Sequence, residues 1–272
     1  CPRITTTFVA LNTSTKQDKT MIENNLPIQL RKLRLGAMAD ALQLQLDQVS
    51  TYEDLAFTER LSLLIDHELL NRDQNKQARL IRLARFKLMA NIQDIDYQHQ
   101  RNIKKDQIAQ LAQTGWLDKA QNLLVTGSCG SGKTYLACAI GHNACLNGYS
   151  ARYYRLSRLL LEMTQAKADG TYQKLLKLLA NTQLLLIDDW GLEPLEAAHR
   201  HDLMEIMDDR HGATSTIVIS QLPTTEWYAS IGDNTFADAI LDRLMHNAHR
   251  LELQGESMRK LRADLTHREH LG

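Results

Sequence analysis

The chain has 272 residues and a mass of 31.0 kDa, enough for one large domain or two ordinary ones with a sizeable hydrophobic core. Hydrophobic residues make up 43% and charged residues 24% of the sequence, which excludes a largely disordered or low-complexity chain. Lys and Arg total 32, as do Asp and Glu, so the net charge of zero gives no indication of a nucleic-acid partner. No apolar run approaches the roughly 20 residues of a membrane span, and the first residues lack the pattern of a secretion signal. We therefore expect a cytoplasmic protein with no membrane partner.

The first part of the chain is predicted to be helical after a short leader. Residues 1–24 show no sustained periodicity and are expected to be disordered. From residue 25 to residue 115 the hydrophobic spacing is helical throughout. Apolar residues at three- and four-residue spacings from 26 to 44 predict one amphipathic helix, and the STYE segment at 50–53 resembles a capping box that opens a second. Residues 25–115 are thus predicted to form a small all-helical domain.

After Gly115 the pattern changes to alternating strands and helices. Short apolar runs predict strands over residues 122–126, 151–154, 183–187, 215–219 and 249–253, and helical sequence separates them, including a helix over 133–146. Strands that alternate with helices favour a parallel sheet covered on both faces. The predicted fold class is therefore α/β, with a five-stranded parallel sheet in residues 116–272.

Residues 127–134 read GSCGSGKT, which matches the phosphate-binding pattern G-x-x-x-x-G-K-[ST] between a predicted strand and a predicted helix. The three glycines allow backbone N–H groups to surround phosphate oxygens, and the helix that follows presents its positive end. The lysine adds a charge at the β- and γ-phosphates, and the threonine hydroxyl is a ligand for Mg²⁺. The predicted site comprises Gly127, Ser128, Cys129, Gly130, Ser131, Gly132, Lys133 and Thr134.

Polar residues follow two further predicted strands. Asp188 and Asp189 come directly after an apolar strand, at the edge where α/β proteins hold ligands. Asp188 would coordinate or orient Mg²⁺, and Asp189 would polarise the attacking water as a general base. Ser220 and Gln221 follow the next strand and could reach the γ-phosphate, although a plain turn before Pro223 fits these residues equally well.

A local excess of positive charge lies in the helical part of the chain. Residues 72–105 contain nine basic and three acidic side chains. Apolar residues interleave with the arginines, so one side of a helix could pack while another contacts nucleic-acid phosphates. The alternative is an ordinary solvated helix face. The predicted DNA-binding residues are Lys76, Arg79, Arg82, Arg85 and Lys87.

Cysteine and histidine residues indicate no zinc site. The four cysteines include no C-x-x-C pair, and no histidine pair has the Cys or Glu partners that would complete a zinc set. Cys138 and Cys145 are seven residues apart on one predicted helix and are expected to be buried thiols. We expect no disulfide.

With these residues in view, the sequence resembles AAA+ ATPases of the IstB/DnaC group, and within it the IstB-like helper ATPases of insertion-sequence transposition. The resemblance covers about residues 26–272. It rests on LPIQLRKLRL at 26–35, DIDY at 94–97, NLLVTG at 122–127, LLLIDDWGL at 184–192, SQLP at 220–223, AILDRL at 239–244 and GESMR at 255–259.

The resemblance implies roles that spacing alone does not. In AAA+ proteins ATP lies between subunits, and an arginine of one protomer reaches the γ-phosphate held by its neighbour. Arg243 matches that arginine, which gives a catalytic set of Lys133, Asp189, Gln221 and Arg243. Gln221 stands where the family usually has Asn, and Asp189 stands where it usually has Glu. A shorter carboxylate must act at a changed distance, so slow hydrolysis is expected. A second sensor role for Arg259 stays open.

The family resemblance implies an ATP- and Mg²⁺-dependent helper of DNA transposition. Such a protein would bind double-stranded DNA with little sequence preference, assemble with copies of itself when ATP is bound, and recruit or activate a cognate transposase. The alternative is a DnaC-like replicative helicase loader, which uses the same ATPase core. A small-molecule phosphotransferase would need an acceptor pocket and lid arginines, for which we find no pattern.

Overall fold

The computed structural model describes residues 25–97 and 102–255. The described residues divide into two compact units, with the boundary between Lys76 and Gln77. None of the helices in the described part of the chain has the length and hydrophobicity of a membrane-spanning segment. The leader predicted over residues 1–24 lies outside the described residues.

The first unit consists of short helices and the beginning of a long one. Residues 25–32 are helical and are followed by α2 (Gly36–Asp47), α3 (Val49–Tyr52) and α4 (Phe57–Ala84), which continues into the second unit. The single helix predicted from 26 to 44 is wrong, because Arg34 has a left-handed φ of 61° that interrupts the helix. The helix predicted to open at 50–53 starts later, at Phe57, where Glu59 accepts a hydrogen bond from the Ala56 N–H at 2.8 Å.

Polar side chains tie α2 to α4 within the first unit. Glu68 is 7% exposed and accepts hydrogen bonds from the Met38 N–H at 3.0 Å and from Arg72 Nε at 2.8 Å. The Met38 bond first, and then Arg72, lower the pKa of Glu68 below its usual value. Glu68 therefore supplies both a negative charge and an acceptor to the first turn of α2, where N–H groups lack helical partners.

The second unit contains a five-stranded, fully parallel sheet with the order β2-β3-β4-β1-β5. The strands are β1 (Asn122–Gly127), β2 (Ala151–Arg155), β3 (Leu184–Trp190), β4 (Ser215–Ser220) and β5 (Ala248–Leu253). All five predicted strands are present, and the predicted fold class is confirmed. The largest difference is in β3, which runs three residues past its predicted end and carries a register shift between Ile187 and Trp190.

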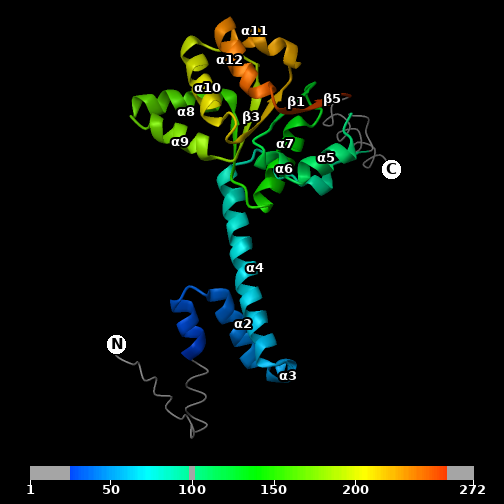
Figure 1. Cartoon of the computed structure of the whole chain (residues 1–272), viewed down its shortest axis with the longest axis vertical. Coiled ribbons are helices and arrows are strands. Elements are labelled where there is room, and N and C mark those ends of the chain that lie inside the picture. The colour runs from blue at the N-terminus through cyan, green and yellow to red at the C-terminus, as the bar shows by residue number, and fades with distance from the viewer. Residues whose placement is uncertain (1–24, 98–101, 256–272) are drawn as a thin grey trace, which may run out of the picture. The chain divides into compact units, whose positions relative to one another are not determined.

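Helices cover both faces of this sheet, as Figure 1 shows. One layer contains the end of α4, α5 (Lys105–Ala112), α6 (Gly115–Asp118) and α7 (Lys133–Leu146), and the other contains α8 (Leu156–Ala168), α9 (Tyr172–Asn181), α10 (Ala197–Arg210), α11 (Trp227–Ile231) and α12 (Asn234–Met245). Two 3-10 turns, η1 (Ile92–Asp94) and η2 (Thr224–Glu226), lie in connections. Strand residues alternate between the layers, since Leu123 and Val125 join one buried cluster while Leu124 joins the other.

The second unit begins well before the boundary predicted near residue 115. Leu80, Ala84, Ala90, Ile95 and Ile108 are all buried in the same cluster as the β1 side chains. Burial of these apolar groups makes them part of the sheet's own core. The change of sequence pattern at 115 therefore coincides with the approach to the first strand and not with the edge of the folded unit.

Candidate nucleotide-binding site

The predicted phosphate-binding loop, residues 127–134, connects the end of β1 to the start of α7, as its sequence predicts. Gly130 and Gly132 have φ values of 83° and 94°, which are left-handed conformations that glycine adopts without strain. Gly127 has a different requirement: a Cβ there would lie 2.2 Å from the Leu253 carbonyl oxygen of β5. The first glycine is thus needed for the close approach of two strands, in addition to any contact with a phosphate.

Lys133 and Ser131 lie inside this loop. Lys133 is 7% exposed, and its Nζ donates hydrogen bonds to the carbonyl oxygens of Gly127 and Ser128, both at 2.7 Å. Burial lowers the pKa of the Lys133 ammonium, against the opposing charges of nearby residues. Within the described residues, the buried Ser131 Oγ has no hydrogen-bond partner. A buried ammonium and a spare hydroxyl next to a helix N-terminus fit an anionic phosphate group.

Asp188 is the centre of the hydrogen-bond network beside the loop. Its carboxylate is 2% exposed, and its Oδ2 accepts hydrogen bonds from Thr134 Oγ1 at 3.0 Å and from Tyr153 OH at 2.6 Å. Its Oδ1 accepts the Asp189 N–H at 2.9 Å. Burial, and next the hydrogen bond to Asp188, raise the pKa of Tyr153 above its usual value, so this phenol stays a donor. Asp188 and Thr134 present the carboxylate and hydroxyl oxygens that Mg²⁺ prefers.

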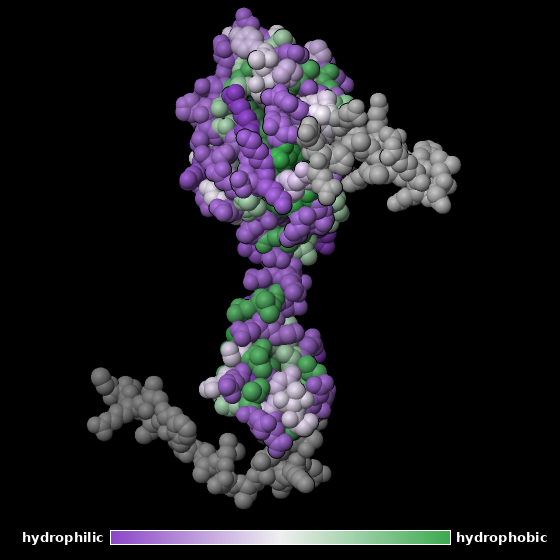
Figure 2. Space-filling model, turned by 90° about the vertical axis from the view of Figure 1, so that its right-hand side faces the viewer, coloured by the Kyte–Doolittle hydropathy of each residue, from purple (hydrophilic) through white to green (hydrophobic). Residues whose placement is uncertain are grey.

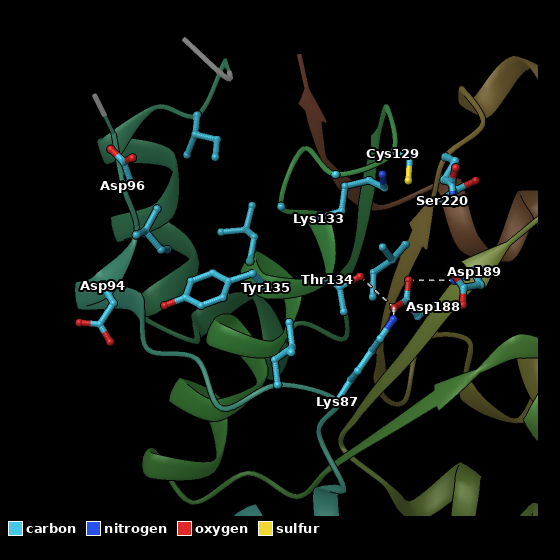
Figure 3. A pocket seen from close by; sticks show the side chains of 18 residues that line it. Lys87, Asp94, Asp96, Cys129, Lys133, Thr134, Tyr135, Asp188, Asp189 and Ser220 are labelled. Carbon is cyan, nitrogen blue, oxygen red and sulfur yellow. Dashed lines mark hydrogen bonds and ion pairs between the residues drawn. The ribbon is translucent and has the colours of Figure 1, made fainter. Parts of the chain in front are cut away.

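Asp189 occupies the irregular position in β3. It has a left-handed φ of 62°, which costs on the order of 1 kcal/mol for a residue other than glycine. Its Oδ2 lies 3.5 Å from Arg155 Nε, and its side chain is 30% exposed. Because of this bulge, the successive carboxylates of Asp188 and Asp189 both line the cavity shown in Figure 3.

A cavity of about 260 Å³ joins these groups (Figure 3). Residues of the loop and of the ends of β3 and β4 form one part of its lining, and the other part contains both apolar and acidic side chains, including Asp94 and Asp96. The part beside the loop suits the phosphates of a nucleotide. The lining residues are Lys87, Leu88, Asp94, Ile95, Asp96, Ile103, Cys129, Gly130, Gly132, Lys133, Thr134, Tyr135, Leu136, Asp188, Asp189, Ile219, Ser220 and Gln221.

Sequence reasoning missed two parts of this site. Lys87, Leu88, residues 94–96 and Ile103 line the cavity, although their sequence suggested only a basic tract and, at 94–97, a family resemblance. Tyr153 reaches Asp188 from β2, and nothing in its sequence context indicated that contact. Both depend on packing between segments that are distant in the chain.

Arg243 does not line this cavity. Its Nε and Nη2 donate to Asp208 Oδ1 at 2.9 and 2.7 Å, and its Nη1 donates to the Ala239 carbonyl at 2.9 Å. Its backbone oxygen accepts from Asn122 Nδ2, at the first residue of β1. The phosphate-type loop follows the last residue of β1, about 16 Å further along the strand at about 3.3 Å per residue. Arg243 therefore lies at the N-terminal ends of the strands, whereas its own phosphate-binding loop lies at their C-terminal ends.

The predicted DNA-binding residues fall into different places. Lys76 is the last residue of the first unit. Arg79 and Arg82 are exposed on α4. On the same helix, Leu80 and Ala84 face the core of the second unit. Arg85 is exposed just after α4. Lys87 differs from these residues, because its side chain lies in the nucleotide cavity. Arg259 lies outside the described residues.

A phosphate-type loop after β1, a carboxylate pair in β3 and the strand order β2-β3-β4-β1-β5 define a P-loop NTPase. Residues 28–265 match the family described as IstB-like ATP binding protein, and the chain belongs to that family. It is an ATP-binding protein and an ATPase of the AAA+ IstB/DnaC group.

Named relatives agree with this assignment, and two solved structures share the fold. The chain is 43% identical over 231 residues to the insertion sequence ATP-binding protein y4pL of Sinorhizobium fredii, covering 85% of this chain and 94% of that one. It is 46% identical over 198 residues to the IS1162 ATP-binding protein of Pseudomonas fluorescens, covering 72% and 85%. The crystal structure of DnaI has a TM-score of 0.53 at 20% identity, covering 65% of this chain and 94% of that one. The DnaC helicase loader has a TM-score of 0.51 at 21% identity, covering 61% and 97%; both structures share the fold.

Replacing Lys133 with alanine tests the phosphate assignment. We expect Lys133→Ala to weaken binding of a fluorescent ATP analogue by about 100-fold or more, since a charge-assisted contact to phosphate is lost. Lys174→Ala, which removes an exposed charge on α9, serves as the control and should bind like the unmodified protein. Unaltered affinity in Lys133→Ala would exclude the loop as the phosphate site.

Replacing Asp189 with asparagine tests the proposed general base. Asparagine tolerates the left-handed conformation, so the bulge and nucleotide binding should both persist. We expect a fall of about 100-fold in single-turnover ATP hydrolysis, because the side chain no longer accepts a proton. An unchanged rate would place the base elsewhere.

Proposed function

We propose that this protein is an ATP-dependent helper of DNA transposition that binds target DNA, assembles with copies of itself and recruits or activates a transposase. The observation that carries this proposal is the family match over residues 28–265, together with relatives named as insertion sequence ATP-binding proteins. The competing function, a DnaC-like helicase loader, has the support of fold likeness at 21% identity. Family membership therefore favours the transposition helper.

The nucleotide chemistry follows from the residues of the cavity. Asp188 and Thr134 would hold Mg²⁺, which when bound neutralises phosphate charge. Lys133 and the N–H groups of the loop would bind the β- and γ-phosphates, and Asp189 would orient and deprotonate the attacking water. Gln221, at the same end of the cavity, would contact the γ-phosphate or that water.

Assembly of several protomers is proposed because Arg243 and the phosphate-binding loop of one chain lie at opposite ends of the strands. A guanidinium stabilises a phosphoryl transition state only at hydrogen-bonding distance. Arg243 would therefore act on ATP held by a neighbouring protomer, with release from Asp208 as the two protomers meet. ATP at this junction would hold neighbours together, and hydrolysis would loosen them.

DNA binding is proposed for the exposed arginines at the end of α4. Arg79 and Arg82 form no ion pair within residues 25–97 and 102–255, so their charges are available to phosphates. Arg85 is exposed one residue after the helix ends. Guanidinium contacts to phosphates position a protein on DNA without reading bases, which would give little sequence preference.

Transposase recruitment is proposed for the helices of the first unit. Several large apolar side chains are exposed there, including Phe57 at 77% and Leu33 at 69%. Figure 2 shows hydrophobic residues on the surface of this unit. Exposed apolar groups of this kind are typical of protein interaction surfaces. The others are Leu26, Ile28, Leu44, Val49, Leu63, Ile65, Leu69 and Leu70.

Mixing two inactive variants tests assembly through Arg243. Arg243→Ala keeps the phosphate loop, and Lys133→Ala keeps the arginine, so mixed assemblies contain some complete junctions. With DNA and ATP present, we expect partial recovery of ATP hydrolysis when the two variants are combined. The double variant Lys133→Ala/Arg243→Ala, mixed with Arg243→Ala, should restore nothing. Inactivity of the first mixture at every ratio would contradict a role for Arg243 across a junction.

Neutralising the three arginines tests the DNA surface. Changing Arg79, Arg82 and Arg85 together to glutamine should weaken duplex binding and reduce the slope of log affinity against log salt by about 3, since each phosphate contact contributes about 0.9. The measurement is fluorescence anisotropy of labelled duplex DNA across a salt series. A triple glutamine variant of Arg158, Lys174 and Lys177, on α8 and α9, is the matched control. Equal losses in both variants would show that the tract has no special role.

A further inference from the structure

Lys87 lies in the nucleotide cavity although its sequence neighbours form the basic tract. Its Nζ is 3.8 Å from Asp188 Oδ2, and its side chain is 31% exposed. Figure 3 shows it extending toward Asp188 from the chain segment that follows α4. Lys133, by contrast, donates to the carbonyl oxygens of its own loop. Lys87 is therefore the lysine that the structure pairs with the buried Asp188 carboxylate.

Packing on α7 fixes the backbone that carries Lys87. The ring of Phe86 occupies the space beside Gly141, where a Cβ would lie 2.7 Å from the Phe86 Cε1. Cys138, also on α7, is fully buried in the same hydrophobic cluster. Ala90 is buried in the same core. Packing of its neighbours Phe86 and Ala90 thus holds the backbone of Lys87 beside the cavity that its side chain lines.

Lys87 approaches an oxygen of Asp188 that is a candidate ligand for Mg²⁺. Asp188 Oδ2 also accepts the Thr134 hydroxyl, which is the second protein ligand expected for Mg²⁺. A cation near this oxygen balances a buried carboxylate, but it repels a second cation at the same place. Lys87 and a Mg²⁺ ion at this oxygen would therefore compete for Asp188.

We propose that Lys87 is a tethered cation that occupies the Mg²⁺ position beside Asp188 until Mg²⁺ and nucleotide displace it. This inference rests on the proposed ATP and Mg²⁺ site. Displacement would free the side chain at a point three residues after α4, the helix that contains residues of both compact units. Lys87 would thus make the segment after α4 responsive to the state of the nucleotide site, and it would set the Mg²⁺ concentration at which the site fills.

The experiment is a Mg²⁺ titration of the full-length protein in the presence of a fluorescent, non-hydrolysable ATP analogue. Lys87→Met keeps the length of the side chain and removes its charge. We expect the Mg²⁺ concentration for half-maximal binding to fall about tenfold, which corresponds to about 1.4 kcal/mol. Lys87→Arg, which keeps the charge, should behave like the unmodified protein. Lys177→Met, which removes a charge from the exposed part of α9, should leave the midpoint unchanged.

Other outcomes contradict the proposal in distinguishable ways. An unchanged midpoint in Lys87→Met would overturn it. A higher Mg²⁺ requirement, or weaker binding of the analogue in EDTA, would instead make Lys87 a phosphate ligand. Weaker DNA binding with an unchanged Mg²⁺ midpoint would return Lys87 to the DNA-binding residues. Failure of the unmodified protein to bind the analogue would overturn the proposed function itself, before Lys87 is tested.

Discussion

The hydrogen bonds and ion pair around the buried Asp188 carboxylate hold the candidate site together. Its partners come from four segments: Thr134 on α7, Tyr153 on β2, the Asp189 N–H in β3, and Lys87 after α4. A buried carboxylate is costly unless it is paired and hydrogen-bonded. Its partners therefore connect the phosphate loop, the sheet and the segment after α4. A change in any of these partners would alter the surroundings of the Asp188 carboxylate, which is proposed to bind Mg²⁺.

The sheet order determines which residues can act within one chain. β1 and β3 both flank β4, so the loop after β1, the carboxylates of β3 and Gln221 after β4 meet at one edge. Arg243 precedes β5 and lies beside the first residue of β1, at the other edge. A single chain thus carries a phosphate site and a candidate arginine that cannot reach it. That separation is the physical basis for proposing that ATP joins neighbouring protomers.

Local sequence patterns predicted the nucleotide-binding core closely. The helix over 133–146 has its predicted bounds, and β1, β2, β4 and β5 each end within one residue of prediction. These elements were predictable because strand alternation, apolar runs and glycine-rich turns are local properties. The helix interruption at Arg34 was not, because an arginine in a left-handed conformation leaves no mark in hydrophobic spacing. The start of the second unit at Gln77 was also missed, because burial of Leu80 and Ala84 needs a sheet more than 30 residues away in sequence.

Contiguous residues were enough to predict the α/β class, the phosphate loop, the Asp188–Asp189 pair and the family. Only the folded chain shows that Tyr153 and Lys87 meet Asp188, that Asp189 lies in a bulge, and that Arg243 faces away from its own loop. These features depend on contacts between residues that are far apart in the sequence. Charge spacing placed Lys87 with four other basic residues, whereas the packing of Phe86 against Gly141 turns it toward a carboxylate about 100 residues away.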